Sequence, residues 1–154
     1  MNRRQHERNR ISAKPDNSAD KLFPDPGPLY KKRILLVEDD PVYQFLMQSL
    51  LNRWKADCAI SGNGRVAIEL LQQELYDIVL MDLEMPEMNG FETVRYIRNI
   101  MKLEIPVIAV TSCDQAEDIL LARTYGMNGY LLKPFEARHL YNTILYHLPV
   151  GQNL

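Results

Sequence analysis

Cysteines and long apolar runs are scarce in this sequence of 154 residues. The two cysteines, Cys58 and Cys113, lie far apart and outside any metal-binding spacing, which excludes a disulfide-stapled protein and indicates reduced thiols in the cytoplasm. The longest apolar run, residues 105–110, is too short to span a bilayer. No secretory apolar segment follows the arginine-rich start, so the sequence predicts neither export nor membrane contact.

Charge is unevenly distributed, although the formal net charge is only −2. Residues 1–33 hold nine Lys/Arg and four Asp/Glu, whereas residues 34–154 hold nine Lys/Arg and sixteen Asp/Glu. The acidic part argues against binding of nucleic acid through phosphates. Four prolines and few apolar residues predict that residues 1–30 are a flexible tail or linker. The domain is then expected at residues 31–148, followed by a C-terminal tail at 149–154.

Short apolar runs alternate with helical patterns from residue 33 onward. The runs predict strands at Ile34–Val37, Cys58–Ile60, Ile78–Met81, Val107–Val110 and Tyr130–Leu132. They are apolar throughout, which is typical of parallel strands covered on both faces. The helical spacing includes Val42, Phe45, Leu46, Ser49 and Leu50, which we expect to form the buried face of the first helix. Five strand–helix units in this length predict an α/β fold with an open, doubly wound parallel sheet.

Acidic residues follow two of the predicted strands directly. Glu38, Asp39 and Asp40 follow the first strand, and Asp82 follows the third. Because sites in such sheets form at the carboxyl ends of the strands, we expect these carboxylates to converge. Their repulsion calls for either a divalent cation, for which Mg²⁺ suits the oxygen ligands, or a lysine such as Lys133. Asp40 precedes a proline, which is typical of a helix N-cap.

Four segments together resemble response regulator receiver domains. They are residues 34–40, 77–90, 105–112 and 129–135, and the resemblance covers about residues 32–148. The block Asp82-Leu83-Glu84-Met85-Pro86-Glu87-Met88-Asn89-Gly90 is the most specific of them. The resemblance implies a flavodoxin-like fold of five strand–helix units with strand order 2-1-3-4-5.

The resemblance also implies a role for individual residues. Asp82 would accept a phosphoryl group, and Mg²⁺ would be bound by Glu38, Asp39, Asp82 and the main-chain carbonyl of Glu84. Thr111 and Lys133 would bind the phosphoryl group, Tyr130 would be an aromatic switch, and the peptide before Pro134 would be cis. The product, an aspartyl phosphate, would be a reversible signal rather than the outcome of an enzyme's turnover.

Partners follow from the same resemblance. The donor would be a phosphohistidine on a histidine kinase or a phosphotransfer protein. The output surface would combine the helix near residues 115–125, the strand at Tyr130–Leu132 and the last helix, on a monomer or weak dimer. The chain would be a stand-alone receiver or the receiver of a hybrid kinase. Two alternatives remain: a receiver-like interaction module that is never phosphorylated, and a haloacid-dehalogenase-like phosphatase, which would need Asp-x-Asp where this chain has Asp82-Leu83-Glu84.

Overall fold

Five strands and five helices alternate strictly in the computed structural model, which describes residues 27–150. The strands are β1 (Arg33–Val37), β2 (Asp57–Ser61), β3 (Ile78–Met81), β4 (Val107–Thr111) and β5 (Gly129–Leu132). The helices are α1 (Pro41–Arg53), α2 (Gly64–Gln73), α3 (Gly90–Asn99), α4 (Ala116–Thr124) and α5 (Ala137–His147). Every predicted strand is therefore confirmed to within one residue at each end.

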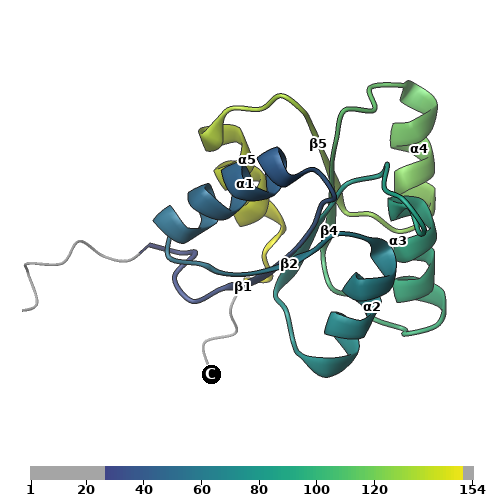
Figure 1. The fold of residues 1–154 in the computed structure, drawn as a ribbon, viewed down its shortest axis with the longest axis horizontal. Helices are drawn as coiled ribbons and strands as arrows, with labels where there is room; N and C mark the ends of the chain where they lie inside the picture. The colour runs from purple at the N-terminus through teal and green to yellow at the C-terminus, as the bar shows by residue number, and fades with distance from the viewer. Residues whose placement is uncertain (1–26, 151–154) are drawn as a thin grey trace, which may run out of the picture.

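The strands form one parallel sheet in the order β2-β1-β3-β4-β5. Figure 1 shows α1 and α5 on one face of the sheet and α2, α3 and α4 on the other. The doubly wound fold and its strand order are thus confirmed. All five carboxyl ends lie along one edge of the sheet because the strands are parallel, and this edge carries the residues described below.

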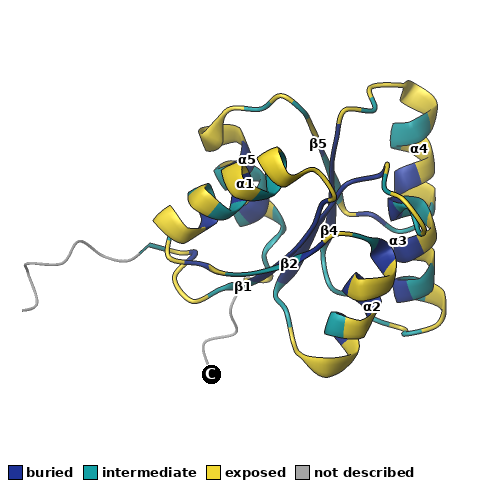
Figure 2. Cartoon of the chain, in the orientation of Figure 1, coloured by how far each residue is buried: buried dark blue, intermediate teal, exposed yellow. Residues whose placement is uncertain are grey.

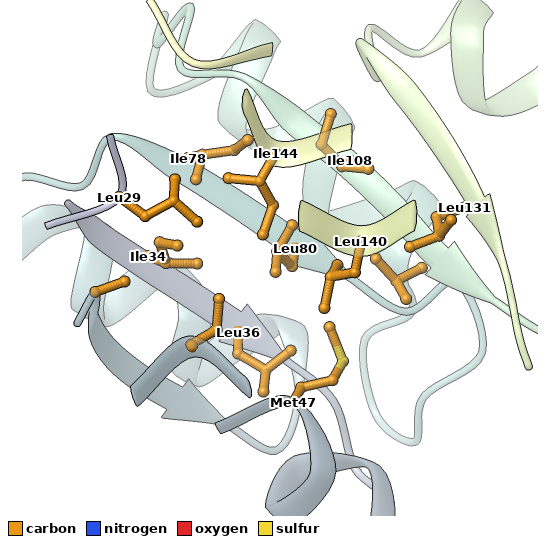
Figure 3. Close-up of a cluster of buried hydrophobic side chains, with 13 residues drawn as sticks. Leu29, Ile34, Leu36, Met47, Ile78, Leu80, Ile108, Leu131, Leu140 and Ile144 are labelled. Carbon is orange, nitrogen blue, oxygen red and sulfur yellow. The ribbon is translucent and has the colours of Figure 1, made fainter. Parts of the chain in front are cut away.

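Alternate residues of each central strand face opposite helical layers. Ile34 and Leu36 of β1 pack toward α1 and α5, whereas Leu35 and Val37 pack toward α2, α3 and α4. Figure 3 shows the first of these cores, in which Leu140 and Ile144 of α5 meet the sheet. The central strands are buried on both faces (Figure 2), which explains why their sequences are continuously apolar rather than alternating.

The buried face of α1 differs from the predicted one. Met47 and Leu51 are buried, while Val42 and Phe45 are about three-quarters exposed and Leu46 is also exposed. The prediction was wrong because apolar residues surround most of this helix, so that spacing alone does not select a face. As folded, α1 leaves an apolar patch of Val42, Phe45 and Leu46 on the surface.

The predicted tail overlaps the core at its last residues. Leu29 is buried in the core that α1 and α5 cover (Figure 3), although the sequence placed it in the tail at residues 1–30. The rest of that prediction, residues 1–26, lies outside the described residues, as do residues 151–154 of the predicted C-terminal tail. No helix within residues 27–150 combines the length and the apolar composition needed to cross a membrane.

Candidate functional site

Except for Tyr130, which lies within β5, the predicted site residues lie at the carboxyl edge of the sheet because the strands are in register there. Val37 of β1 pairs with Met81 of β3, so the next residues, Glu38 and Asp82, leave the sheet side by side. The Asp82 amide also donates a hydrogen bond to the Val37 carbonyl at 2.9 Å. On the other side, Thr111 of β4 pairs with Leu132, and the Lys133 amide donates to the Thr111 carbonyl.

Three carboxylates and one ammonium group meet at this edge. Glu38, Asp39 and Asp82 each offer an oxygen, and these oxygens lie within 4.8 Å of one another. Lys133 Nζ lies 2.5 Å from Glu38 Oε2 and 3.2 Å from Asp82 Oδ2. Glu38 is 1% exposed and Asp82 is 8% exposed, whereas Asp39 is open to solvent. The lysine therefore compensates two buried carboxylates, and the third faces outward.

Burial and ion pairing act in opposite directions on this cluster. Burial raises the pKa of Glu38 above its ordinary value, and the hydrogen bond from Lys133 only partly opposes this. For Lys133, burial lowers the pKa, but the bonds and the charge attraction of Glu38 and Asp82 outweigh burial and leave the pKa raised. Lys133 is therefore held firmly as a cation in a site that retains an excess of carboxylates.

The loops around the cluster fix the carboxylates in place. Asp40 is the N-cap of α1, as predicted, and its side chain accepts a hydrogen bond from the Val42 amide. The Asp40 amide in turn donates to Glu38 Oε1 at 3.0 Å. In the loop after β3, the Glu84 amide donates to Asp82 Oδ1 at 3.2 Å. Asp82 thus accepts hydrogen bonds from two directions, through Oδ1 from the backbone and through Oδ2 from Lys133.

A cavity opens beside the carboxylates on the side of the β3–α3 loop. Asp39 and Glu84 line it together with Leu83, Met85, Pro86, Asn89 and Phe91. The exposed acid of the cluster and the loop that follows Asp82 therefore border the same open space.

Thr111, at the end of β4, and Tyr130, within β5, both bond to the loop that follows β4. Thr111 is fully buried, and its hydroxyl accepts a hydrogen bond from the Cys113 amide at 3.3 Å. The Tyr130 hydroxyl donates to the Cys113 carbonyl. Burial and the neighbouring anionic groups raise the pKa of Tyr130 to about 12, so the phenol keeps its proton at neutral pH. Both side chains thus contact the same short loop between β4 and α4.

Two further features surround Lys133. Its ammonium group lies 4.1 Å from the ring centroid of Tyr43, which makes a cation–π contact from α1. The sequence analysis missed Tyr43, because nothing in the spacing of α1 distinguishes this aromatic residue from its apolar neighbours. The Lys133–Pro134 peptide is cis.

The composition of the cluster suits a hard divalent cation. All of its donors are oxygens, as Mg²⁺ prefers, and the solvent-exposed Asp39 leaves room for coordinated water. Lys133 neutralises one of the three negative charges. The residues present therefore fit Mg²⁺, with Glu38, Asp39 and Asp82 as the side chains available to hold it.

Comparison with known proteins gives consistent matches. The family model of the response regulator receiver domain matches residues 34–145. Protein PilH of Pseudomonas aeruginosa is 35% identical over 113 residues, which cover 73% of this chain and 93% of PilH. The probable C4-dicarboxylate response regulator DctR of Bacillus subtilis is 36% identical over 110 residues. That match covers 70% of this chain but only 48% of DctR, so the chain spans about half of DctR's length.

Solved structures match the fold as well. The receiver domain of the sensor histidine kinase PA1611 from Pseudomonas aeruginosa superposes with a TM-score of 0.69 and 30% identity. The match covers 75% of this chain and 96% of that receiver domain, whose structure holds a magnesium ion in its active-site cleft. The likeness therefore extends over nearly the whole of a receiver domain.

Proposed function

The chain belongs to the response regulator receiver domain family of two-component signalling, and we propose that its Asp82 accepts a phosphoryl group from a phosphohistidine on a partner protein. The geometry of Asp82 carries this proposal. Asp82 is buried and forms an ion pair with Lys133, which also pairs with Glu38. The neighbouring Asp39 is exposed to solvent. The domain is a signalling switch in this proposal, and the aspartyl phosphate is its active state.

Each residue around Asp82 has a task in the transfer. A carboxylate oxygen of Asp82 forms a bond to phosphorus while the bond to the donor's imidazole nitrogen breaks. Lys133 and the Glu84 amide, which already bind the two oxygens of Asp82, orient the carboxylate before the reaction. Thr111 lies on the neighbouring strand, and its hydroxyl is proposed to donate a hydrogen bond to a phosphoryl oxygen. Lys133 remains beside the phosphoryl group as a compensating charge.

Mg²⁺ is the proposed cofactor. When bound by Glu38, Asp39, Asp82 and the Glu84 main-chain carbonyl, it supplies positive charge that offsets the repulsion between a carboxylate and a phosphoryl group. The Asp39 carboxylate has a distinct part in this site, because it is the one acidic ligand that the protein leaves exposed.

We expect wild-type protein to gain one phosphoryl group when it is incubated with Mg²⁺ and acetyl phosphate. Asp82→Asn removes the nucleophile, so the expected labelling of this variant is nil. Intact-mass spectrometry measures the label directly. A receiver-like module that is never phosphorylated would leave both proteins unlabelled, and equal labelling of both would assign the phosphoryl group to another residue. Either result would reject the proposal.

A second expected result concerns the metal alone. Mg²⁺ at ten times its dissociation constant should stabilise the wild-type fold by about 1.4 kcal/mol, because it binds only the folded state. Asp39→Ala removes an exposed ligand at little cost to folding and should abolish this gain. Chemical denaturation with and without Mg²⁺ gives both values. Equal stabilisation of the variant and the wild type would count against a metal site that includes Asp39.

The apolar patch on α1 is the proposed contact for the donor. Val42, Phe45 and Leu46 are exposed on this helix, which begins directly after the acidic residues. A partner that brings a phosphohistidine to Asp82 would pass the start of α1, where the exposed aromatic ring of Phe45 would be the anchor of the contact.

Phe45→Asp is expected to slow phosphoryl transfer from a phosphorylated histidine phosphotransfer domain about tenfold, the loss of roughly one well-packed contact. Labelling by acetyl phosphate should stay at the wild-type level, because Phe45 does not touch the carboxylates. Leu75→Asp is the matched control, since Leu75 is exposed in the loop after α2. An equal slowing by both variants, or by neither, would rule out α1 as the docking surface.

The output surface is proposed on α4, β5 and α5. Leu120, Leu121 and Leu132 expose apolar side chains there. Tyr130 of β5 is bonded to the Cys113 carbonyl in the loop that leads to α4, so a shift of Thr111 on phosphorylation would be transmitted to this face. A downstream protein would bind this surface of a monomer or weak dimer. We place the exchange in the cytoplasm, where Cys58 and Cys113 remain thiols.

A further inference from the structure

A groove between α1 and α5 has no role in the proposed phosphoryl transfer. It lies where the end of α1 meets the first turns of α5, and its lining consists of Leu50, Arg53, Trp54, Ala137, Arg138 and Tyr141. Trp54 and Tyr141 are partly buried, and their rings meet edge to face with centroids 5.0 Å apart. The groove thus offers an aromatic surface large enough for another apolar side chain.

Two exposed arginines border this aromatic surface. Neither Arg53 nor Arg138 takes part in any of the ion pairs found among residues 27–150. Unpaired guanidinium groups beside an apolar groove favour an occupant that combines a large apolar side chain with carboxylates. Such an occupant would bury its apolar group on Trp54 and place its carboxylates at the rim.

The described chain begins beside this groove. A Cβ atom on Gly27 would lie 4.0 Å from the Tyr141 hydroxyl oxygen. Two residues later, Leu29 is buried in the core against which Trp54 and Tyr141 also pack. The described chain therefore enters the domain at the α1–α5 face, with its first residue beside the groove.

The sequence just before Gly27 has the composition that the groove favours. Leu22 and Phe23 are the only large apolar residues between Ser12 and Pro26, and residues 20–26 around them hold Asp20, Lys21 and Asp25, an acidic excess of one charge. Phe23 is four residues from Gly27, and an extended chain of four residues spans up to about 14 Å. This distance exceeds the roughly 10 Å width of a helix. Pro24 and Pro26 restrict the chain between them, which lowers the entropy lost on docking.

We propose that residues 20–26 of this chain occupy the α1–α5 groove, with Phe23 on Trp54 and Tyr141, and with Asp20 and Asp25 paired to Arg53 and Arg138. The segment then holds α1 against α5 and fixes where the upstream polypeptide leaves the domain. This docking does not depend on phosphorylation of Asp82, so it stands or falls separately from the proposed function.

The test uses Trp54, the only tryptophan of the chain, as a probe of the groove. In the full chain, Phe23→Ala should expose Trp54, with a red shift of its emission and stronger quenching by acrylamide. The charge reversal Asp20→Arg with Asp25→Arg should have the same effect, and adding Arg53→Asp with Arg138→Asp should restore protection. Ile11→Ala is the matched control, since it removes an apolar side chain farther up the chain, and should leave the emission unchanged.

Two results would overturn the proposal. Equal quenching of the wild type and Phe23→Ala would show that residues 20–26 do not cover Trp54, so that the groove is open or belongs to another protein. Protection that rises with protein concentration, together with a dimer in sedimentation, would assign the groove to a second copy of the chain. Circular dichroism of each variant ensures that a change in emission reflects the groove and not unfolding.

Discussion

Gly90→Ala is expected to destabilise the domain by about 3 kcal/mol, at the upper end for a small-to-large substitution in a packed region. A Cβ atom at this position would overlap the Asp82 carbonyl oxygen and lie 2.9 Å from Leu83 Cα. Both obstacles are backbone atoms of the loop that carries the proposed phosphoacceptor, and the Gly90 amide already donates to the Leu83 carbonyl at 2.9 Å. The loop has to move to accommodate the methyl group.

The same displacement should reduce function. A shift of about 1 Å at a reacting group can cost about a hundredfold in rate, so we expect acetyl phosphate to label Gly90→Ala about a hundredfold more slowly. Helix propensity alone predicts the opposite sign for stability, because alanine is favoured over glycine by about 1 kcal/mol within a helix, and Gly90 begins α3. The experiment therefore separates a close backbone approach from a local helix preference.

Gly62→Ala is the matched control for this prediction. A Cβ atom at Gly62, in the turn after β2, would meet nothing within 4 Å. Its expected effect on the free energy of unfolding is within about 1 kcal/mol, and in the stabilising direction. Urea denaturation and the labelling rate of both variants give the comparison. Wild-type stability and labelling in Gly90→Ala would contradict the role assigned to this contact.

The sequence predicted the sheet and the residues at its carboxyl edge well for a physical reason. Parallel strands covered on both faces must be apolar throughout, so a short apolar run such as Ile78–Met81 indicates a buried strand. A polar residue directly after such a run has to lie at the carboxyl edge. The placement of Glu38, Asp82 and Lys133 therefore followed from the strand ends alone.

Features that depend on packing between distant segments were not predictable in this way. The exposed Val42 and Phe45 have the same spacing as a buried stripe would have, and only the position of α1 over the sheet distinguishes the two. Leu29 follows Pro24, Pro26 and Pro28, a composition typical of a linker, yet its side chain is buried in the core. The contact of Tyr43 with Lys133 joins α1 to the end of β5 and leaves no local signal.

Lys133→Met is expected to destabilise the metal-free protein by about 3 kcal/mol, at the lower end for breaking a buried ion pair. The ammonium group is almost fully buried and is bonded to Glu38 and Asp82, so its loss leaves two buried carboxylates without their cation. The Asp40 and Glu84 amides still donate to these carboxylates, which keeps the cost near the lower end. Added Mg²⁺ should stabilise this variant more than the wild type, because it supplies the missing charge.

The pH dependence of this loss has a defined sign. Glu38 already has a raised pKa in the folded wild type, and removal of Lys133 raises it further, because that lysine opposes the effect of burial. The pKa of Glu38 in the folded protein lies above its unfolded-state value of 4.5, so protonation of Glu38 favours folding as the pH falls toward 4.5. This stabilisation is lost as the pH rises through the folded-state pKa. The difference in unfolding free energy between Lys133→Met and the wild type should therefore be smaller at acidic than at neutral pH.

Two further variants distinguish charge from packing in this result. Glu38→Gln combined with Lys133→Met removes one uncompensated charge together with the lysine, and should recover much of the lost stability. Lys102→Met makes the same change at an exposed lysine, for which we expect an effect within about 0.5 kcal/mol. If Lys133→Met and Lys102→Met unfold at the same urea concentration at neutral pH without Mg²⁺, the buried ion pair does not hold this edge of the sheet together. In that case the orientation of Asp82 would have to come from the Glu84 amide alone.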